Sequence, residues 1–495
     1  MLVGLLLLAS LASLTVDVSA SEYDPPGLYD VDYFQLENGL DIVLKKRTHA
    51  RNVAVRLIVN VGLRNFPCDK RETPHFLEHL LFMGTSKHSE AELSRLIQDH
   101  GGGWNGATSG TETVYQIDIF DKHVPLAIGT LYEIITDTVI TPQKIESARA
   151  VIHRERSGNH STFFRWLYKN GIGKSAAEKA LALVLPGTSV ICPGLVTPEG
   201  ISEANVREAY KDYYVPANMT LVLVGNFDRD ELVSRIKSTF GRLTRTAGGG
   251  SKVVAPPYPR EQAEVTGTLA PFLGSDGTVG FVYRTEGFDS PDHLAMWVLE
   301  KYLDRVLYER LRIDSALSYA PASGYYSEGD YAVFMMAADV NLEKMETTKE
   351  LLKKELERLK TDGIKIEDLN ANKNRILLDR ARAFESNDSI AAYYVKKRHE
   401  LRMNGKLTNH VAAIARLTPE DLQRVANKYL RDDSRVIVRS TPTLTFTQFY
   451  IGLGIFTVTV PGAGFYLVRR FVKRHRNWIA NSEDHATGQL KKLFP

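Results

Sequence analysis

One short apolar stretch, Pro74 to Gly84, limits what this chain can fold into. As a helix it places His75, Glu78 and His79 on one face, because residues three and four apart are neighbours on a helix surface. Apolar side chains cover most of the remaining circumference. Polar groups in so apolar a helix face a core or a cleft, where they need partners. An amphipathic helix that turns its polar residues toward solvent therefore fits this stretch poorly.

The same three side chains have the chemistry of a metal site with a base beside it. The imidazoles of His75 and His79 can bind Zn²⁺, and the carboxylate of Glu78 lies close enough to deprotonate a water molecule on the metal. The order His-x-x-Glu-His reverses the His-Glu-x-x-His pattern of many zinc enzymes. Such a spacing also arises by chance, so the five residues alone leave a metal site and an ordinary polar helix face both open.

Length and composition are typical of a globular protein with more than one domain. The chain has 495 residues, 43% hydrophobic and 24% charged, which allows two or three domains and argues against disorder. The formal net charge is +3, but residues 469–495 carry seven Lys and Arg against two acidic residues, a local +5 that leaves the rest at −2. The body of the chain therefore gives no indication of a nucleic-acid partner.

Two cysteines, Cys68 and Cys192, are too few for a disulfide scaffold or for a cysteine-based zinc site. Both lie in predicted loops. In an oxidising compartment they can form one disulfide bond, and two unpaired thiols remain the equal alternative.

Both ends of the chain carry membrane-related signals. An apolar run over residues 2–14, followed by small residues at a cleavage point, predicts a signal peptide over residues 1–20; a buried first helix is the alternative. Residues 449–468 contain no charge and are long enough to cross a bilayer, and the basic cluster behind them predicts a cytoplasmic tail over 469–495. We therefore expect a single-pass, membrane-anchored protein with its bulk outside the cytoplasm, in the periplasm if the source is bacterial. A core element of the last domain is the alternative for residues 449–468.

A short polar segment after the second predicted helix is a candidate edge strand. Glycines end that helix, and Trp104–Ser109 then predicts a brief extended piece before a strand over Thr113–Phe120. A sparse, glycine-flanked edge strand can accept a peptide by strand addition. An ordinary surface loop fits the composition equally well.

The chain divides into two halves with a similar order of elements. The Gly- and Pro-rich segment 246–261 predicts an interdomain linker. Residues 421–440 repeat the pattern of residues 206–226, a helix that ends near a tyrosine and is followed by a strand. We expect an α+β fold of two related halves, 22–245 and 262–440, each an antiparallel-rich sheet with helices packed on one face, plus a C-terminal single-pass transmembrane helix.

With these features assembled, the sequence resembles the pitrilysin/insulinase family of inverted-zincin metallopeptidases. It is most similar to the short type, typified by the β subunit of mitochondrial processing peptidase and by small bacterial homologues. The likeness spans residues 30–440. The first half then corresponds to a zinc-bearing peptidase domain and the second half to a peptidase-like domain.

The resemblance implies one Zn²⁺ per chain, held by His75, His79 and a glutamate in a later helix that follows a proline. Glu155, 76 positions after His79, matches that glutamate, and its local competitors are Glu146 and His160. One family feature is missing. The family has a further glutamate two turns before the ligand, where this chain has Ala148, and its absence weakens the expected outer support of the metal.

The resemblance also implies residues that hold the substrate. Four residues match the family's substrate-pairing edge strand: Asn105, Gly106, Ala107 and Thr108. The second of these is usually alanine in the family. Arg312 and Tyr319, seven positions apart, match a pair that contacts substrate near the scissile carbonyl. Without the resemblance, a surface arginine and a half-buried tyrosine would be the simpler interpretation.

The function that follows is a zinc-dependent metalloendopeptidase that hydrolyses unfolded peptides or small proteins. Glu78 acts as general base, and Arg312 and Tyr319 stabilise the oxyanion or orient the chain. Relatives work as pairs of such two-domain units, so we expect a homodimer or a heterodimer with a sister chain of the same fold. The alternative is a non-catalytic, membrane-anchored peptide-binding or structural subunit.

Overall fold

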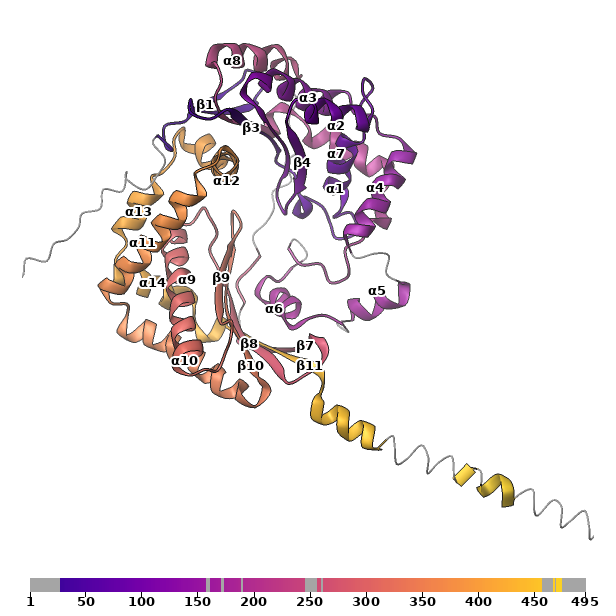
Figure 1. Cartoon of the computed structure of the whole chain (residues 1–495), viewed down its shortest axis with the longest axis vertical. Helices are drawn as coiled ribbons and strands as arrows, with labels where there is room; N and C mark the ends of the chain where they lie inside the picture. Colours follow the sequence, from indigo (N-terminus) through magenta and orange to yellow (C-terminus); the bar gives the residue numbers. More distant parts are fainter. Residues whose placement is uncertain are drawn as a thin grey trace, which may run out of the picture.

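The structure is a computed structural model with two β-sheets, one in each half of the chain (Figure 1). It describes residues 27–156, 161–170, 173–187, 190–244, 256–259, 261–455, 466–467 and 469–473. The predicted signal peptide lies outside these residues, and so does most of the predicted linker. The exact domain boundaries therefore stay a prediction.

The first sheet has six strands in the order β1-β2-β6-β3-β5-β4. Only β2 and β6 run parallel to each other; all other neighbours are antiparallel. The strands are β1 (Asp32–Gln35), β2 (Asp41–Lys46), β3 (Asn52–Val59), β4 (Gly103–Thr108), β5 (Thr113–Phe120) and β6 (Met219–Gly225). The segment predicted as an edge strand is thus β4, the outermost strand on one side of this sheet.

The second sheet repeats the arrangement of the first with five strands, in the order β7-β11-β8-β10-β9. Its parallel pair, β7 with β11, joins the first strand of this half to the last, whereas the parallel pair of the first half joins its second strand, β2, to its last, β6. The strands are β7 (Ala263–Gly274), β8 (Asp276–Thr285), β9 (Ala322–Ser327), β10 (Ala332–Asn341) and β11 (Val436–Thr445). The two halves therefore share one topology, as the repeated sequence pattern predicts, and β9 occupies the place that β4 holds in the first half.

Most helices cover the outer face of the sheet in their own half, and α6 and α12 are exceptions. The helices of the first half are α1 (Thr73–Phe82), α2 (Glu90–Gln98), α3 (Val124–Thr136), α4 (Pro142–Glu155), α5 (Thr162–Lys169), α6 (Ala176–Val184), α7 (Glu203–Tyr213) and α8 (Arg229–Ser238). Those of the second half are α9 (His293–Leu307), α10 (Met345–Asp362), α11 (Ile366–Ala383), α12 (Asn387–Asn404), α13 (His410–Arg416) and α14 (Pro419–Tyr429). A π-helical turn, Tyr308–Asp314, extends α9.

The two halves exchange helices, so the prediction of helices on one face only is wrong. Helix α12 of the second half packs on the inner face of the first sheet, against Val43, Ala54 and Val222. Helix α6 of the first half packs on the inner face of the second sheet (Figure 1). The cause is visible in the strands: all seven residues of β6 are buried, and a strand with apolar residues on both faces needs cover on both.

Ion pairs fix helix α12 to the first sheet. The buried guanidinium of Arg398 pairs with Glu112 at 2.5 Å and donates to Asn60 at 2.9 and 3.0 Å. Arg56, buried in strand β3, pairs with Asp118 at 2.9 Å and with Asp388 of α12 at 2.5 Å. Ion pairs as well as apolar contacts therefore hold helix α12 of the second half against the first sheet.

In the second half, one buried carboxylate joins α9 to α14. Asp292, at the start of α9, accepts hydrogen bonds from Arg424 at 2.7 Å, Lys428 at 2.8 Å and the Tyr429 hydroxyl at 2.7 Å. Burial raises the pKa of Asp292, but these three donors outweigh it and lower the pKa to about 2.

The predicted transmembrane helix over residues 449–468 is wrong for the described structure, and the single-pass, membrane-anchored location inferred from it falls with it. Among the described residues, every helix is too short or too polar to cross a bilayer. A helix starts at Phe446, directly after β11, and is described as far as Ile455. Residues 456–465 and 468 lie outside the described residues, as does the tail beyond residue 473.

Candidate metal centre

Helix α1 carries the His-x-x-Glu-His motif and is anchored by its apolar residues. Pro74 stands in the first turn, where its missing N–H costs nothing. Phe76, Leu77, Leu80 and Leu81 are fully buried in the core beneath the first sheet. With these side chains fixed against the core, the motif's polar residues face helix α4 on one side and strand β4 on the other.

Two histidines of α1 and one glutamate of α4 converge on one point. The Nε2 atoms of His75 and His79 lie 3.2 Å apart, and Glu155 Oε2 lies 3.1 Å from the first and 3.4 Å from the second. The two imidazoles are mostly buried, whereas the Glu155 side chain is 46% exposed. The competitor Glu146 instead pairs with Arg149 on the exposed side of α4, and His160 lies outside the described residues.

This donor set fits a zinc ion. Tetrahedral zinc with nitrogen and oxygen ligands at about 2.0–2.1 Å requires its ligand atoms to lie about 3.3 Å from one another. The three separations observed here, 3.1, 3.2 and 3.4 Å, scatter around that value. No rearrangement of His75, His79 or Glu155 is needed for the three atoms to serve as ligands of one ion.

A buried glutamate that the motif does not include orients the first histidine. Glu72 is fully buried, and its Oε2 accepts a hydrogen bond from His75 Nδ1 at 2.8 Å while its Oε1 pairs with Arg156 at 2.7 Å. Because Nδ1 carries the proton, Nε2 keeps its lone pair for the cluster. Burial lowers the pKa of His75, but the bond to Glu72 and the nearby carboxylates outweigh it and raise the pKa.

Glu72 was not predicted from the sequence, because the resemblance places the residue that supports the metal ligands at position 148. Ala148 is fully buried in the core and offers no polar group. The available signal was a carboxylate three positions before His75, one helical turn away and at the helix start. The outer support that Ala148 lacks therefore comes from the other helix of the cluster.

Glu78 is held between helix α1 and strand β4. The Thr108 hydroxyl donates to Glu78 Oε2 at 2.6 Å. At Gly106 an added Cβ would lie 2.6 Å from the Phe82 ring, 2.9 Å from Glu78 Cγ and 3.2 Å from Glu78 Oε1. The absence of a side chain at Gly106 thus allows β4 to approach the helix closely, and it leaves Oε1 of Glu78 beside the strand's backbone.

The four residues predicted to pair with substrate lie in β4, at the open edge of the first sheet. Within the described residues β4 pairs only with β5. Asn105 and Ala107 are exposed, and Asn105 Oδ1 accepts a hydrogen bond from the backbone N–H of Gly106 at 2.9 Å. One edge of β4 therefore offers main-chain groups next to Glu78.

Arg312 and Tyr319 are brought to each other but not to the metal cluster. The Arg312 guanidinium lies 4.2 Å from the centroid of the Tyr319 ring and donates to the Tyr319 carbonyl at 2.5 Å. Tyr319 is 74% exposed. In the part of the chain that is described, no hydrogen bond, ion pair or ring contact joins either residue to His75, His79 or Glu155.

The two cysteines, whose pairing the sequence left open, form a disulfide bond in the structure. Cys68 and Cys192 have Cα atoms 5.7 Å apart. The bond ties the segment that leads into α1 to the loop that follows α6. The approach to the metal helix is thereby covalently joined to a second, distant part of the chain.

Comparison with known proteins identifies the class to which this fold and cluster belong. The family model described as "Insulinase (Peptidase family M16)" matches residues 41–182, which contain the whole metal cluster. The model described as "Peptidase M16 inactive domain" matches residues 200–376, which contain Arg312 and Tyr319. The chain thus carries both domains of a peptidase-type fold, with the His-x-x-Glu-His motif in the first. It belongs to the M16 (pitrilysin/insulinase) family.

Individual relatives agree with this assignment. A protein of Rickettsia felis named "uncharacterized zinc protease" is 22% identical over 406 residues, covering 81% of this chain and 92% of the relative. The mitochondrial-processing peptidase subunit beta of Blastocladiella emersonii is 27% identical over 243 residues, covering 48% of this chain and 50% of the relative. The crystal structure of a protease from Helicobacter pylori has the same fold, with a TM-score of 0.72 at 22% identity, covering 83% of this chain and 99% of that one.

Proposed function

We propose that this protein is a zinc metalloendopeptidase that hydrolyses unfolded peptides or small proteins. The observation that carries the proposal is the convergence of His75 Nε2, His79 Nε2 and Glu155 Oε2 at separations of 3.1 to 3.4 Å, beside a buried carboxylate, Glu78. Relatives named as zinc proteases and as processing peptidases support the same activity.

The metal ligands and Glu78 have different roles in the proposed peptide hydrolysis. Zinc bound by His75, His79 and Glu155 would supply a Lewis acid and lower the pKa of water toward about 7. Glu78 accepts the proton of the attacking water on Oε1, since Thr108 already occupies Oε2, and then delivers the proton to the leaving amine.

Strand β4 positions the substrate in this scheme. An extended peptide adds to the open edge of the first sheet, held by main-chain hydrogen bonds at Asn105, Gly106, Ala107 and Thr108. Because Glu78 Oε1 lies beside Gly106, a peptide on this edge passes the general base. Arg312 and Tyr319 of the second half orient the peptide or stabilise the oxyanion once substrate draws them toward the cluster.

We further propose that the active protein is a pair of such chains. A relative named as a subunit supports an assembly, and Glu155 and Tyr319 are both partly open to solvent, as groups that face a shared chamber would be. This chain holds both the metal ligands and the Arg312/Tyr319 pair, which is compatible with a homodimer and with a sister chain of the same fold. Light scattering coupled to gel filtration gives the mass of the pair.

The catalytic proposal is tested with one substitution and one matched control. Glu78→Gln keeps the shape of the side chain but removes the base, so we expect peptide cleavage to fall by about 10²–10⁴-fold while zinc stays bound. Glu146→Gln, the same change on the exposed side of α4, should leave cleavage as it was. The measurement is hydrolysis of a diverse library of unfolded peptides, with zinc content determined on the same samples. A zinc-loaded wild type that cuts nothing in that library would refute the proposal and leave peptide binding without cleavage as the function.

A further inference from the structure

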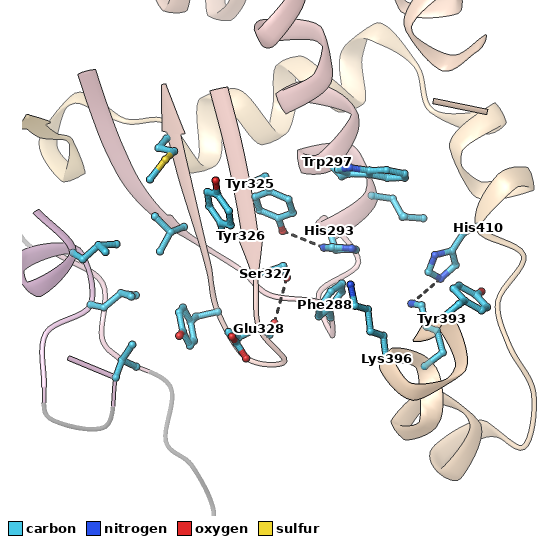
Figure 2. A pocket seen from close by; sticks show the side chains of 18 of the residues that line it. Phe288, His293, Trp297, Tyr325, Tyr326, Ser327, Glu328, Tyr393, Lys396 and His410 are labelled. Carbon is cyan, nitrogen blue, oxygen red and sulfur yellow. Dashed lines mark hydrogen bonds between the residues drawn. The ribbon is translucent and has the colours of Figure 1, made fainter. Parts of the chain in front are cut away.

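A cavity lies away from the metal cluster. It has a volume of about 900 Å³ and opens between strands β9 and β10, helices α9, α12 and α13, and the segment that follows α6 (Figure 2). None of the metal ligands, Glu78 or the β4 residues lines it. Its size lies within the range of ligand-binding pockets, and both halves of the chain contribute to its wall.

Most of the cavity wall is apolar and aromatic. Phe288, Trp297, Tyr325 and Tyr393 surround its inner part, and Figure 2 shows these rings around one hollow. Leu181 of α6 also lines the cavity, as do Leu185, Val190 and Ile191 of the segment that follows this helix. Such a wall favours an apolar or aromatic group over a hydrated one.

The polar groups of the inner part show which hydrogen bonds a ligand can make. The Tyr325 hydroxyl donates to the carbonyl of Glu286 at 2.8 Å, so it accepts from His293 Nδ1, 3.2 Å away (Figure 2). His293 Nε2 is then a lone-pair acceptor. Burial, reinforced by Lys397, lowers the pKa of His293 to about 4, which keeps the ring neutral near pH 7. A ligand with an N–H group would satisfy this acceptor.

The charged groups of the wall are mostly cationic. Three of the lining residues are basic, Arg380, Lys396 and Lys397, whereas Glu328 is the single acidic one. Lys397 is engaged internally, at 3.0 Å from His410 Nε2 and 3.3 Å from Glu400. Lys396 is exposed and, among the described residues, pairs with no carboxylate. The wall therefore attracts an anion and repels an ammonium group.

We propose that this cavity binds the C-terminal residue of a peptide, with its carboxylate at Lys396, its apolar side chain among the aromatic rings and its N–H group on His293 Nε2. A peptide C-terminus carries these three features within one residue, whereas an N-terminus brings an ammonium group to a cationic wall. The proposal extends the proposed function, since it assigns a recognition site for the far end of a substrate. It predicts a preference for peptides that end in an aromatic or aliphatic residue with a free carboxylate.

The test compares two peptides that differ only in the group at the C-terminus. An unfolded, fluorescently labelled peptide ending in Phe is prepared as the free acid and as the C-terminal amide, and both are titrated with the full chain carrying Glu78→Gln to prevent cleavage. We expect the amide to bind about tenfold more weakly, which corresponds to about 1.4 kcal/mol. Lys396→Ala in the same background should bring the two affinities to within about twofold, and Lys396→Arg should restore the difference, since it keeps the charge.

A matched control separates this site from general charge effects. Lys353, an exposed lysine on α10, does not line the cavity, and Lys353→Ala should keep the tenfold preference for the acid. The ratio of acid to amide affinity within one variant is insensitive to its overall stability. Equal affinities for acid and amide, no measurable binding of either, or an equal loss of preference in Lys353→Ala would overturn the assignment. A preference without any cleavage by the wild type would instead refute the proposed function and leave this site in place.

Discussion

Replacing Glu72 by glutamine should weaken zinc binding without touching a ligand. Glu72 is fully buried and accepts a charge-assisted hydrogen bond from His75 Nδ1 at 2.8 Å. Hydrogen bonds to charged groups contribute about 1.5–3 kcal/mol, and loss of an outer partner of a metal ligand costs about 10–100-fold in affinity, which is about 1.4–2.7 kcal/mol. The two estimates agree, so we expect the dissociation constant for zinc to rise 10- to 100-fold.

The assay is a competition between the protein and a chromophoric zinc chelator of known affinity, at a temperature where every variant is folded. Glu146→Gln is the matched control, because Glu146 is an exposed glutamate of helix α4 that pairs with Arg149 rather than with the metal cluster. Unchanged zinc affinity in Glu72→Gln would show that Glu72 does not orient His75. An equal loss in the control would attribute the effect to charge near the site and refute the reasoning in the same way.

Three further predictions concern the strand, the disulfide bond and acid stability. Gly106→Ala places a methyl group 2.9 Å from Glu78 Cγ, and the displaced base should lower kcat about 10- to 100-fold with zinc content unchanged, measured by steady-state kinetics and metal analysis. Removing the disulfide by substituting both Cys68 and Cys192 with serine opens a loop of 124 residues, and denaturant titration should show a loss of up to about 5 kcal/mol; an unchanged midpoint would contradict this. The pKa of Asp292 is lowered to about 2, so the stability it contributes is present above the unfolded-state pKa of about 3.9 and is lost as the pH falls toward 2. In Asp292→Asn, the free energy of unfolding should therefore fall by about 1 kcal/mol less than in the wild type as the pH is lowered toward 2, after allowance for solvent screening. An acid dependence identical to that of the wild type would refute the assignment.

The metal helix was predictable because local spacing fixes its geometry. Positions three and four apart share a helix face whatever the rest of the fold does, so His75, Glu78 and His79 could be placed together from the sequence. Glu155 is on another helix, and only the resemblance to a known family selected it over its neighbours. The structure brings its carboxylate to both imidazoles.

What the sequence did not reveal depends on contacts between distant segments. The packing of α12 and α6 on the sheet of the other half could not be predicted from local sequence. An apolar helix face shows that the helix is packed against something, but not against which sheet. Glu72 was overlooked because its role depends on burial at a helix start, and burial is a property of the packed fold. The apolar segment after β11 led to a wrong prediction, because an uncharged run of about 20 residues does not by itself show a membrane span, and no helix among the described residues is long and apolar enough to be one.

The central claim, a single zinc-dependent peptidase site, is tested most directly by titrating zinc into the chelator-treated wild-type chain while peptide cleavage is followed. We predict that cleavage is absent at the start, rises in proportion to added zinc and levels off at about one ion per chain, the stoichiometry expected of one ion at the cluster of His75, His79 and Glu155. Cleavage that persists without metal, or a zinc-saturated chain that cleaves nothing, would contradict the account.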